Sequence, residues 1–352
     1  MRTADRLIGL AEATASGLWG LSAGIRRAPA LTERDPTIEL TVAARRIVAR
    51  DDDVLALTLI ASDGIPLPPW RPGAHIDVRL PSGRLRQYSL CADPESRDSY
   101  RIAVRRIPGG GGGSVEIHDE LDVGARVTTG GPRNAFPLTV PGHGSPMRAL
   151  RFIAGGIGIT PILSMAALAA RLGADWSMVY TGRTPQSLPF LDELARYGDR
   201  VEVRTDDARG LPTAGELLGD CRDGTAVYAC GPPPMLTAIR AELAGRKHVG
   251  LHFERFAAPP VIDGEPFSVR VASSGAVIHV SADETLLAAL QRDGVAAPYS
   301  CQQGFCGTCR TRVLAGIVDH RDTLLTEPER RDGVMLVCVS RANTGDQLTL
   351  QL

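Results

Sequence analysis

The stretch Cys301-Gln-Gln-Gly-Phe-Cys306-Gly-Thr-Cys309, followed at a distance by Cys338, decides the fold of the C-terminal part of the chain. The C-x4-C-x2-C spacing with a distant fourth cysteine matches the plant-type pattern of [2Fe–2S] ligation. Gly304 and Gly307 permit the positive φ angles that a loop curling around a cluster requires. The spacing therefore predicts an iron–sulfur site whose ligands are Cys301, Cys306, Cys309 and Cys338.

A zinc site or a disulfide cluster is the alternative interpretation of these cysteines. Zinc ribbons usually present two close cysteine pairs, whereas this loop has one pair with unmatched partners. The chain has 7 cysteines, an odd number unlike the even framework of small secreted disulfide proteins. Both observations favour the iron–sulfur site and a reducing, cytoplasmic compartment. Cys91 and Cys221 are expected to be ordinary small apolar residues.

Length and composition limit the classes of function. The 352 residues correspond to two or three domains at about 150 residues each. The 39 basic and 40 acidic residues leave a net charge of −1, which argues against a nucleic-acid partner. The 38 glycines and 25 prolines indicate many tight turns and places where backbone approaches a ligand. Cofactor binding is therefore the favoured function.

Two changes of hydrophobic pattern divide the chain into domains. Residues 37–145 hold short β-branched runs broken by Gly and Pro, which predicts an antiparallel β-barrel. Residues 146–256 alternate apolar strands with helical stretches, as a parallel α/β sheet does. An Ala- and Pro-rich linker at 257–266 precedes a last domain at 267–352.

The predicted barrel strands are Ile38–Val48, Val54–Ile60, His75–Leu80, Gln87–Cys91, Tyr100–Arg106 and Arg126–Thr129. The predicted parallel strands are Leu150–Ala154, Met178–Thr181, Val201–Arg204 and Ala226–Cys230. The last domain is expected to contain strands Phe267–Ala272 and Val277–Ser281 and a helix at Leu286–Arg292.

The N-terminal extension, residues 1–36, carries a glycine-weakened helical stripe and is predicted to be helical. Glu12 interrupts its apolar stretch and no clear cleavage site follows, so a signal peptide is disfavoured. The uncharged run Phe152–Ala170 is long enough for a membrane span. Its glycines and Pro161 instead predict a strand, a turn and a helix. We expect no membrane anchor.

A glycine-rich turn follows the first predicted parallel strand. It runs Ala154-Gly-Gly-Ile-Gly-Ile-Thr-Pro161 and opens a helix, with Pro161 suited to the first helical turn. Such a turn lets backbone approach a pyrophosphate, but it does not match the Rossmann G-x-G-x-x-G pattern. The predicted pyrophosphate site consists of Gly155, Gly156, Gly158, Thr160 and Pro161. A purely structural turn is the alternative.

The strings Gly316-Ile-Val-Asp-His-Arg-Asp322 and Val337-Cys-Val-Ser-Arg341, together with the domain order, resemble the phthalate dioxygenase reductase and vanillate demethylase reductase family. These are reductase components of Rieske-type oxygenases, and the resemblance extends over residues 37–352. It implies a flavin-binding β-barrel, a ferredoxin reductase-like nucleotide domain and a β-grasp plant-type ferredoxin domain. His118 and His320 lie in family-like strings and are interpreted as structural.

The resemblance also implies a flavin site, with FMN as the flavin and FAD as the alternative. Arg86-Gln-Tyr88-Ser89-Leu90 matches the R-x-Y-S-L motif of the superfamily: Arg86 would meet phosphate, Tyr88 the isoalloxazine face and Ser89 its polar edge. Arg105 and the segment Gly112, Gly113 and Ser114 resemble the second flavin segment. The glycine run at 109–113 departs from relatives that carry an Arg, which puts the strength of phosphate binding in doubt.

The nucleotide is expected at two further places in the second domain. By resemblance, Cys230 would lie beside the nicotinamide, with the Gly231-Pro232 turn shaping the pocket. Arg183 is a candidate for the phosphates or ribose of the dinucleotide. Since no cluster of basic residues for a 2′-phosphate stands out, NADH is preferred to NADPH. Phe256 is a candidate for shielding the flavin, and packing between domains is the equally open alternative.

These features predict an NADH-dependent reductase component that passes electrons from NADH to FMN, to the [2Fe–2S] cluster and to an oxygenase partner. Cys230 and Ser89 are the candidate catalytic residues. We expect a monomer that meets its partner in a transient complex. Two alternatives remain open: a reductase serving a quinone, cytochrome or ferredoxin, and a non-catalytic redox sensor.

Overall fold

The computed structural model describes residues 37–51, 53–109, 112–256, 261–299, 302–304, 307–322, 324–342 and 347–352. The chain divides into Met1–Thr37 and Ile38–Leu352, and every element described below belongs to the second unit. The predicted N-terminal helix, Cys301, Cys306, Gly110 and Gly111 of the glycine run, and residues 257–260 of the linker lie outside the described residues.

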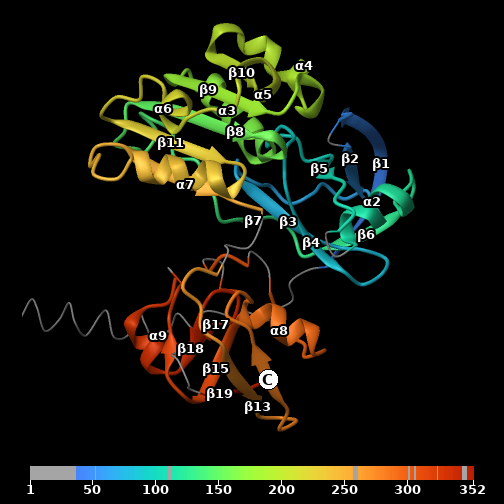
Figure 1. Cartoon of the computed structure of the whole chain (residues 1–352). Helices are drawn as coiled ribbons and strands as arrows, with labels where there is room; N and C mark the ends of the chain where they lie inside the picture. The colour runs from blue at the N-terminus through green and yellow to red at the C-terminus, as the bar shows by residue number, and fades with distance from the viewer. Residues whose placement is uncertain are drawn as a thin grey trace, which may run out of the picture. The chain divides into compact units, whose positions relative to one another are not determined.

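The first sheet is antiparallel throughout, with strand order β4-β3-β6-β1-β2-β5 and β7 paired to β3 (Figure 1). The predicted antiparallel sheet is therefore confirmed. Among the described residues no ladder joins β4 to β5, so the closure of the sheet into a barrel stays a prediction. Its strands are β1 (Ile38–Ala49), β2 (Val54–Ala61), β3 (Ala74–Arg79), β4 (Leu85–Ser89), β5 (Tyr100–Arg105), β6 (Arg126–Thr129) and β7 (Arg133–Asn134).

Strand β4 begins and ends two residues earlier than the predicted Gln87–Cys91. Its ladder to β3 stops at Ser89, which pairs with His75. Beyond it, the amide of Leu90 donates to the Ala74 carbonyl (2.8 Å), whereas that of Cys91 donates to the Arg101 carbonyl (2.9 Å). The chain therefore crosses from β3 toward β5 at this point, and the predicted boundary was wrong because hydrophobic alternation does not reveal a change of partner.

Helix α2 (Gly113–Glu120) packs against the core of this sheet. Ile117 is fully buried there, together with Leu57, Ile76 and Val104 from three strands. Glu116, also buried, accepts hydrogen bonds from the amide and hydroxyl of Ser82 and from Arg84. The helix is thereby fixed beside β4 and β5, with its N-terminus at the end of β5.

The second sheet is parallel, in the order β10-β9-β8-β11-β12. Helix α3 (Ile159–Arg171) covers one face, and α6 (Ala214–Leu218) and α7 (Pro233–Glu242) cover the other. The strands are β8 (Ala149–Gly155), β9 (Trp176–Gly182), β10 (Val201–Thr205), β11 (Thr225–Cys230) and β12 (Gly250–Glu254). The short helical turns are η1 (Gly156–Gly158), η2 (Pro185–Ser187), α4 (Leu191–Leu194), η3 (Ala195–Arg200) and α5 (Asp206–Arg209).

Four strands of this sheet were predicted and are confirmed, but β12 was missed. Its side chains are mostly half-buried, and His252 is exposed, so the apolar run that marks a central parallel strand is absent there. The run Phe152–Ala170 forms the end of β8, the η1 turn and most of α3, as predicted. Within the described ranges, no helix is both long and apolar enough to cross a membrane.

The third sheet has the order β14-β13-β19-β15-β17, with β13 and β19 parallel and the other pairs antiparallel. Helix α8 (Leu286–Arg292), with the predicted bounds, packs on its core, and that core includes Cys309 and Cys338. The strands of this sheet are β13 (Phe267–Val271), β14 (Val277–Val280), β15 (Arg310–Ala315), β17 (Val334–Leu336) and β19 (Gln347–Leu350). Strands β16 (Val318–Asp319) and β18 (Arg341–Ala342) form a separate antiparallel pair, and helix α9 (Glu327–Arg331) precedes β17.

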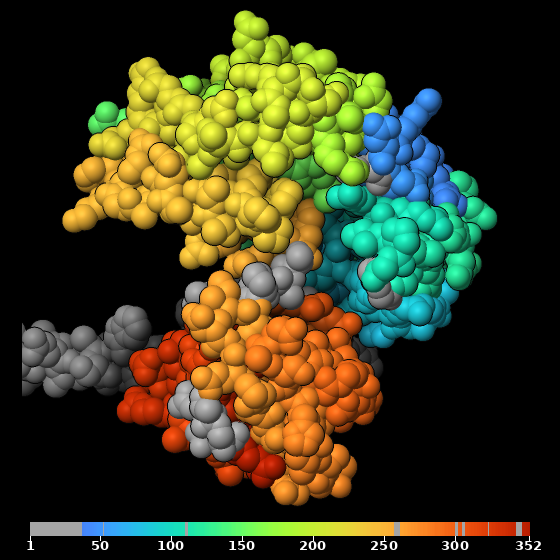
Figure 2. All heavy atoms as spheres, viewed as in Figure 1, coloured from blue at the N-terminus to red at the C-terminus, as the bar shows by residue number. Residues whose placement is uncertain are grey.

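The first and second sheets are joined by an ion pair. Arg101 of β5 donates to both carboxylate oxygens of Glu193 in α4 (2.7 and 2.8 Å), and its guanidinium lies over the Phe190 ring. In Figure 2 the blue-to-cyan atoms of the first sheet meet the green-to-yellow atoms of the second. This contact joins β5 to α4, the helix that follows β9 in the chain.

Candidate functional site

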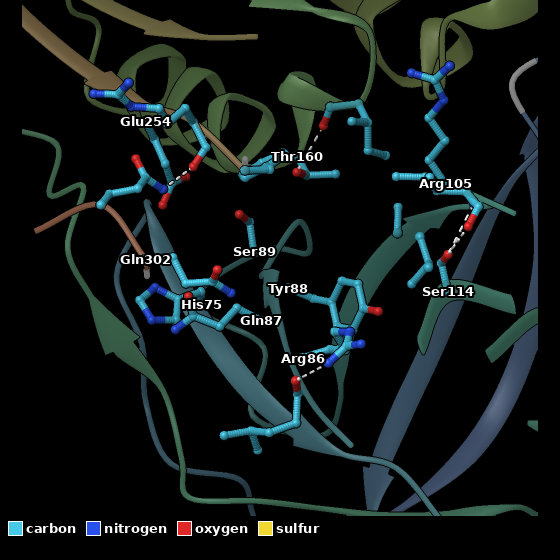
Figure 3. Close-up of a pocket in the computed structure, with 18 of the residues that line it drawn as sticks. His75, Arg86, Gln87, Tyr88, Ser89, Arg105, Ser114, Thr160, Glu254 and Gln302 are labelled. Atoms are coloured by element: carbon cyan, nitrogen blue, oxygen red, sulfur yellow. Dashed lines mark hydrogen bonds between the residues drawn. The ribbon is translucent and has the colours of Figure 1, made fainter. Parts of the chain in front are cut away.

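A cavity of about 480 Å³ lies where β4, β5, the glycine turn after β8 and the end of β12 come together (Figure 3). Its lining includes seven predicted site residues: Arg86, Tyr88, Ser89, Arg105, Ser114, Thr160 and Phe256. Gln302 and Gln303, from the cysteine loop, also line it. One cavity therefore gathers residues from all three sheet regions.

Strand β4 supplies one wall. Tyr88 and Arg86 point to the same cavity from alternate positions, and Ser89 is buried at the end of the strand (Figure 3). Burial raises the pKa of the Tyr88 hydroxyl well above its usual value, more than the nearby Arg86 charge lowers it. Tyr88 is therefore neutral at physiological pH and offers an aromatic ring and a hydrogen-bonding hydroxyl.

The N-terminus of α2 supplies the basic end of the cavity, with Arg105 and Ser114. Gly112 has a φ of 79°, a conformation that favours glycine. A Cβ on Gly113 would lie 2.5 Å from Arg86 Nε, so the absence of a side chain lets Arg86 pass over the start of the helix. Guanidinium groups next to free helix N–H groups form a setting that suits a phosphate.

The glycine turn and the Cys230 turn pack directly against each other. Ala154 on β8 pairs with Cys230 on β11, so both turns leave the sheet at the same edge. A Cβ on Gly158 would lie 2.2 Å from the Cys230 carbonyl oxygen, and one on Gly155 would lie 2.7 Å from Pro232 Cδ. The two segments that the sequence assigned to the dinucleotide are thus brought together at the carboxyl ends of parallel strands, where ligands of such sheets bind.

Several predicted nucleotide residues lie outside the cavity lining. These are Gly155, Gly156, Gly158, Pro161, Arg183, Cys230, Gly231 and Pro232, as well as Gly112 and Gly113 of the flavin segment. Arg183 is exposed just after β9, at the same sheet edge, and its carbonyl accepts from the amide of Asp207 (3.0 Å). The cavity therefore accounts for most of the predicted flavin residues, and the sheet edge for the nucleotide residues.

Sequence analysis missed Glu254, the last residue of β12. Its side chain lines the cavity and is buried beside Cys230, its register partner on β11. Burial raises the pKa of Glu254 to about 8, although a hydrogen bond with Ser89 works in the opposite direction. Its Oε2 is buried without a hydrogen-bond partner in the described part of the chain. The signal that could have found it is its place at the carboxyl end of a parallel strand, but that strand was not recognised.

Cys230 itself is fully buried and remains a thiol. Burial raises the pKa of its thiol well above the usual value, and the Glu254 carboxyl adds to this effect. The thiol therefore has no thiolate reactivity at neutral pH. Its neighbourhood can orient a ligand by packing and hydrogen bonding rather than by nucleophilic attack.

Two of the four predicted cluster ligands can be placed. Cys309 and Cys338 are buried, and their Sγ atoms lie 3.2 Å apart. Gly304 and Gly307 have φ angles of 79° and 76°, as the loop model requires. Closely spaced thiols in the core and glycines in the left-handed region suit a [2Fe–2S] cluster.

Comparisons with known proteins agree with these sites. Residues 269–343 match the model of the 2Fe-2S iron-sulfur cluster binding domain, and residues 152–241 match that of the oxidoreductase NAD-binding domain. The chain is 44% identical over 306 residues to the phenoxybenzoate dioxygenase subunit beta of Ectopseudomonas oleovorans, covering 86% of this chain and 93% of the relative.

Two solved structures are also similar. Phthalate dioxygenase reductase, a modular structure for electron transfer from pyridine nucleotides to [2Fe–2S], matches with a TM-score of 0.67 and 33% identity, over 91% of this chain and 99% of that one. An intact type IV self-sufficient cytochrome P450 monooxygenase matches with a TM-score of 0.69 and 39% identity, over 93% of this chain but 43% of that chain.

The fold and sites define a modular oxidoreductase with an NAD-binding domain and a 2Fe-2S ferredoxin domain. The chain belongs to the family of the phthalate dioxygenase and vanillate demethylase reductases.

Proposed function

We propose that this chain is the NADH-dependent reductase component of a multicomponent oxygenase. The observation that carries the proposal is the cavity shared by β4, β12 and the cysteine loop, because it gives a flavin one side toward the nucleotide and one toward the cluster. A flavin held by the residues that line the cavity would supply the chemistry that joins a two-electron hydride donor, NADH, to a one-electron iron–sulfur centre and so to the oxygenase protein.

The residues that would hold the flavin are those that line the cavity. Arg86, Arg105 and Ser114 would bind the phosphate of FMN, Tyr88 would lie on the ring, and Ser89 would hydrogen-bond its polar edge. Phe256, half-exposed at the cavity, would cover the ring until the nicotinamide displaces it. Gly112 and Gly113 would let α2 approach the phosphate.

The dinucleotide would lie along the carboxyl edge of the parallel sheet. Its pyrophosphate would be bound by Gly155, Gly156, Gly158, Thr160 and Pro161, and its nicotinamide by Cys230, Gly231 and Pro232. Arg183 would contact the ribose or phosphates. With Ser89, Cys230 forms the proposed catalytic pair, and its role is to orient the nicotinamide.

If the adenosine lies at the β10 end of the sheet edge, the charges there support NADH over NADPH. Asp206 and Asp207 begin α5 directly after β10, and their negative charge disfavours a 2′-phosphate. The two nearby arginines are already ion-paired, Arg204 with Glu216 (2.7 Å) and Arg209 with Glu202 (2.8 Å).

The proposed domains are 37–145, 146–256 and 267–352, with the first sheet acting as a flavin barrel and the third as a β-grasp ferredoxin. Cys301 and Cys306 would complete the ligand set with Cys309 and Cys338. We expect a monomer in the cytoplasm that meets its oxygenase transiently. A haem protein acceptor is the second candidate, favoured by the similarity to the P450 monooxygenase chain.

An anaerobic titration of the purified protein tests the proposal. NADH should bleach the flavin absorbance and then reduce the cluster, chromatography of the released cofactor should give FMN, and NADPH should act far more weakly. A protein that can be reconstituted with neither flavin nor iron would contradict the proposal. Electron transfer to a Rieske oxygenase, with none to a P450, would favour the oxygenase over the haem protein as the acceptor.

A further inference from the structure

A buried carboxylate, Asp322, lies in the segment that follows β16. Its side chain has an exposed fraction of 0%. Oδ1 accepts hydrogen bonds from the amides of Leu324 (3.1 Å) and Leu325 (2.7 Å), which closes a tight turn at this point. Burial of a charge is energetically costly unless the charge is paired or hydrogen-bonded. The burial of the Asp322 carboxylate therefore calls for a structural or functional explanation.

Two other groups face this carboxylate. Arg330 of α9 donates to the Asp322 carbonyl oxygen (3.3 Å), and its Nη2 lies 3.6 Å from Oδ1. His320 places Nδ1 3.6 Å from Oδ2, and both of these atoms are buried without a hydrogen-bond partner among the described residues. Oδ1 is therefore hydrogen-bonded and lies near the Arg330 guanidinium, whereas Oδ2 faces the His320 ring without a hydrogen bond in the described part of the chain.

The turn contacts both halves of the predicted cluster loop. A Cβ on Gly304 would lie 3.3 Å from Asp322 Cα and 2.7 Å from Val339 Cγ2, and Val339 follows the ligand Cys338. A Cβ on Gly307 would lie 3.0 Å from Leu324 Cδ2. Leu325, held by the same carboxylate, belongs to the core that contains Cys309 and Cys338.

We propose that Asp322 is a positioning residue for the iron–sulfur site: its carboxylate orders the turn that supports Gly304 and Gly307, and its negative charge lowers the reduction potential of the cluster. Net charge and the surroundings of the sulfurs set the potential of such clusters. In a medium of low effective dielectric constant, a nearby negative charge opposes the addition of an electron. The inference rests on the proposed cluster site.

The two contributions of Asp322 can be separated by two substitutions. Asp322→Asn keeps an oxygen for the Leu324 and Leu325 amides and removes the charge, so the midpoint potential should become more positive with iron content near that of the parent. Asp322→Ala also removes the acceptor, so the affinity for the cluster should fall by about 10- to 100-fold, the range found for outer-shell partners of metal ligands, and the cluster should be lost faster.

The readouts are the midpoint potential from a redox titration followed by electron paramagnetic resonance, the iron content per chain, and the rate of absorbance bleaching. Glu327→Gln is the matched control, because Glu327 is 79% exposed on α9 and carries the same charge near Arg330. Its potential should equal that of the parent.

An Asp322→Asn protein with the potential of the parent would overturn the charge effect, and an Asp322→Ala protein that keeps its cluster as long as the parent would overturn the positioning role. If Asp322→Asn binds no iron, Asp322→Glu is measured: recovery of iron supports the need for the charge, and its failure contradicts it. A parent protein without iron would instead sink the proposed function.

Discussion

Glu254 makes the stability of the protein depend on pH. Burial raises its pKa to about 8. At pH values between the ordinary pKa of a glutamate and this raised value, the folded state therefore keeps a proton on Glu254 that the unfolded state has already released. The free energy of unfolding should therefore fall as the pH rises from about 5 to about 8, by at most about 1.4 kcal/mol per pH unit from this group.

Urea unfolding of Glu254→Gln and of the parent between these pH values measures the effect. In the variant, the free energy of unfolding should lack the decrease with pH that Glu254 causes, because glutamine does not titrate. Glu242→Gln, on α7, is the control and should keep the slope of the parent. Equal slopes for the parent and Glu254→Gln would mean that Glu254 is charged in the folded protein.

Gly158 is the residue that permits close contact between the two nucleotide turns. A Cβ would lie 2.2 Å from the Cys230 carbonyl oxygen, so Gly158→Ala must force the turns apart. We expect a loss of stability of about 1–3 kcal/mol, typical of overpacking, and a rise in the KM for NADH.

Steady-state NADH oxidation with an artificial acceptor measures this rise. Gly215→Ala in α6 is the matched control, since no atom lies within 4 Å of its Cβ position and alanine favours helix. An unchanged KM in a folded Gly158→Ala protein would argue against the assignment of this turn to the dinucleotide.

At this scale the sequence revealed residues that belong to short motifs. Arg86, Tyr88 and Ser89 could be expected to line one cavity because they lie close together on one strand, and they do line it, while their role toward a flavin stays a prediction. Glu254 could not, because its raised pKa comes from burial in the folded protein and its nearness to Cys230 from the pairing of β11 with β12, a strand that the hydrophobic pattern did not reveal.

At the scale of elements, the contact between β5 and α4 depends on Arg101 and Glu193. Both side chains are mostly buried, with exposed fractions of 22% and 24%. Arg101→Met leaves Glu193 without this partner, which should cost about 1–3 kcal/mol of stability. The cost should appear in thermal or urea unfolding.

A double-mutant cycle with Glu193→Gln isolates the coupling of the two side chains. The exposed pair Arg222 and Asp220, with exposed fractions of 81% and 78%, is the control, and its disruption should leave stability nearly unchanged because solvent screens exposed ion pairs. A coupling energy no larger than in this control would show that the ion pair does not hold the sheets together.

Element boundaries agreed with the prediction where local sequence signals determine them. Helix α8 has the predicted bounds, because Thr285 caps its N-terminus and its apolar positions share one face. Strand β4 departs from prediction because Leu90 and Cys91 bond to different neighbours. Hydrophobic alternation carries no information about such an exchange.

At the scale of the whole molecule, the two halves of the proposed electron path can be separated. Cys309→Ala removes a cluster ligand from the core of the third sheet. Electron transfer to a protein acceptor such as cytochrome c or the oxygenase should fall at least about 100-fold, in line with the loss of a cluster ligand, while NADH should still bleach the flavin.

Stopped-flow spectroscopy follows the flavin, and cytochrome c reduction follows the transfer. Cys221→Ala, a buried cysteine of the second domain, is the control and should retain both activities. Loss of flavin reduction in a folded Cys309→Ala protein would place the cluster before the flavin and reverse the proposed order.

The change from an antiparallel to a parallel sheet could be predicted from the sequence because each part has its own period of hydrophobic residues, whereas the domain bounds stay a prediction. The shared cavity could not, since it requires β4, the end of β12 and residues 302–303 to meet. These contacts depend on packing between segments that are distant in the sequence, and short motifs do not encode such packing.

The burial of Cys230 has a chemical consequence for the life of the protein. Peroxide and alkylating agents attack the thiolate form of cysteine, and this side chain is kept protonated and out of water. This sulfur atom therefore lies at the carboxyl edge of the parallel sheet without being available for oxidation, so peroxide and alkylating agents should leave Cys230 unmodified in the folded protein.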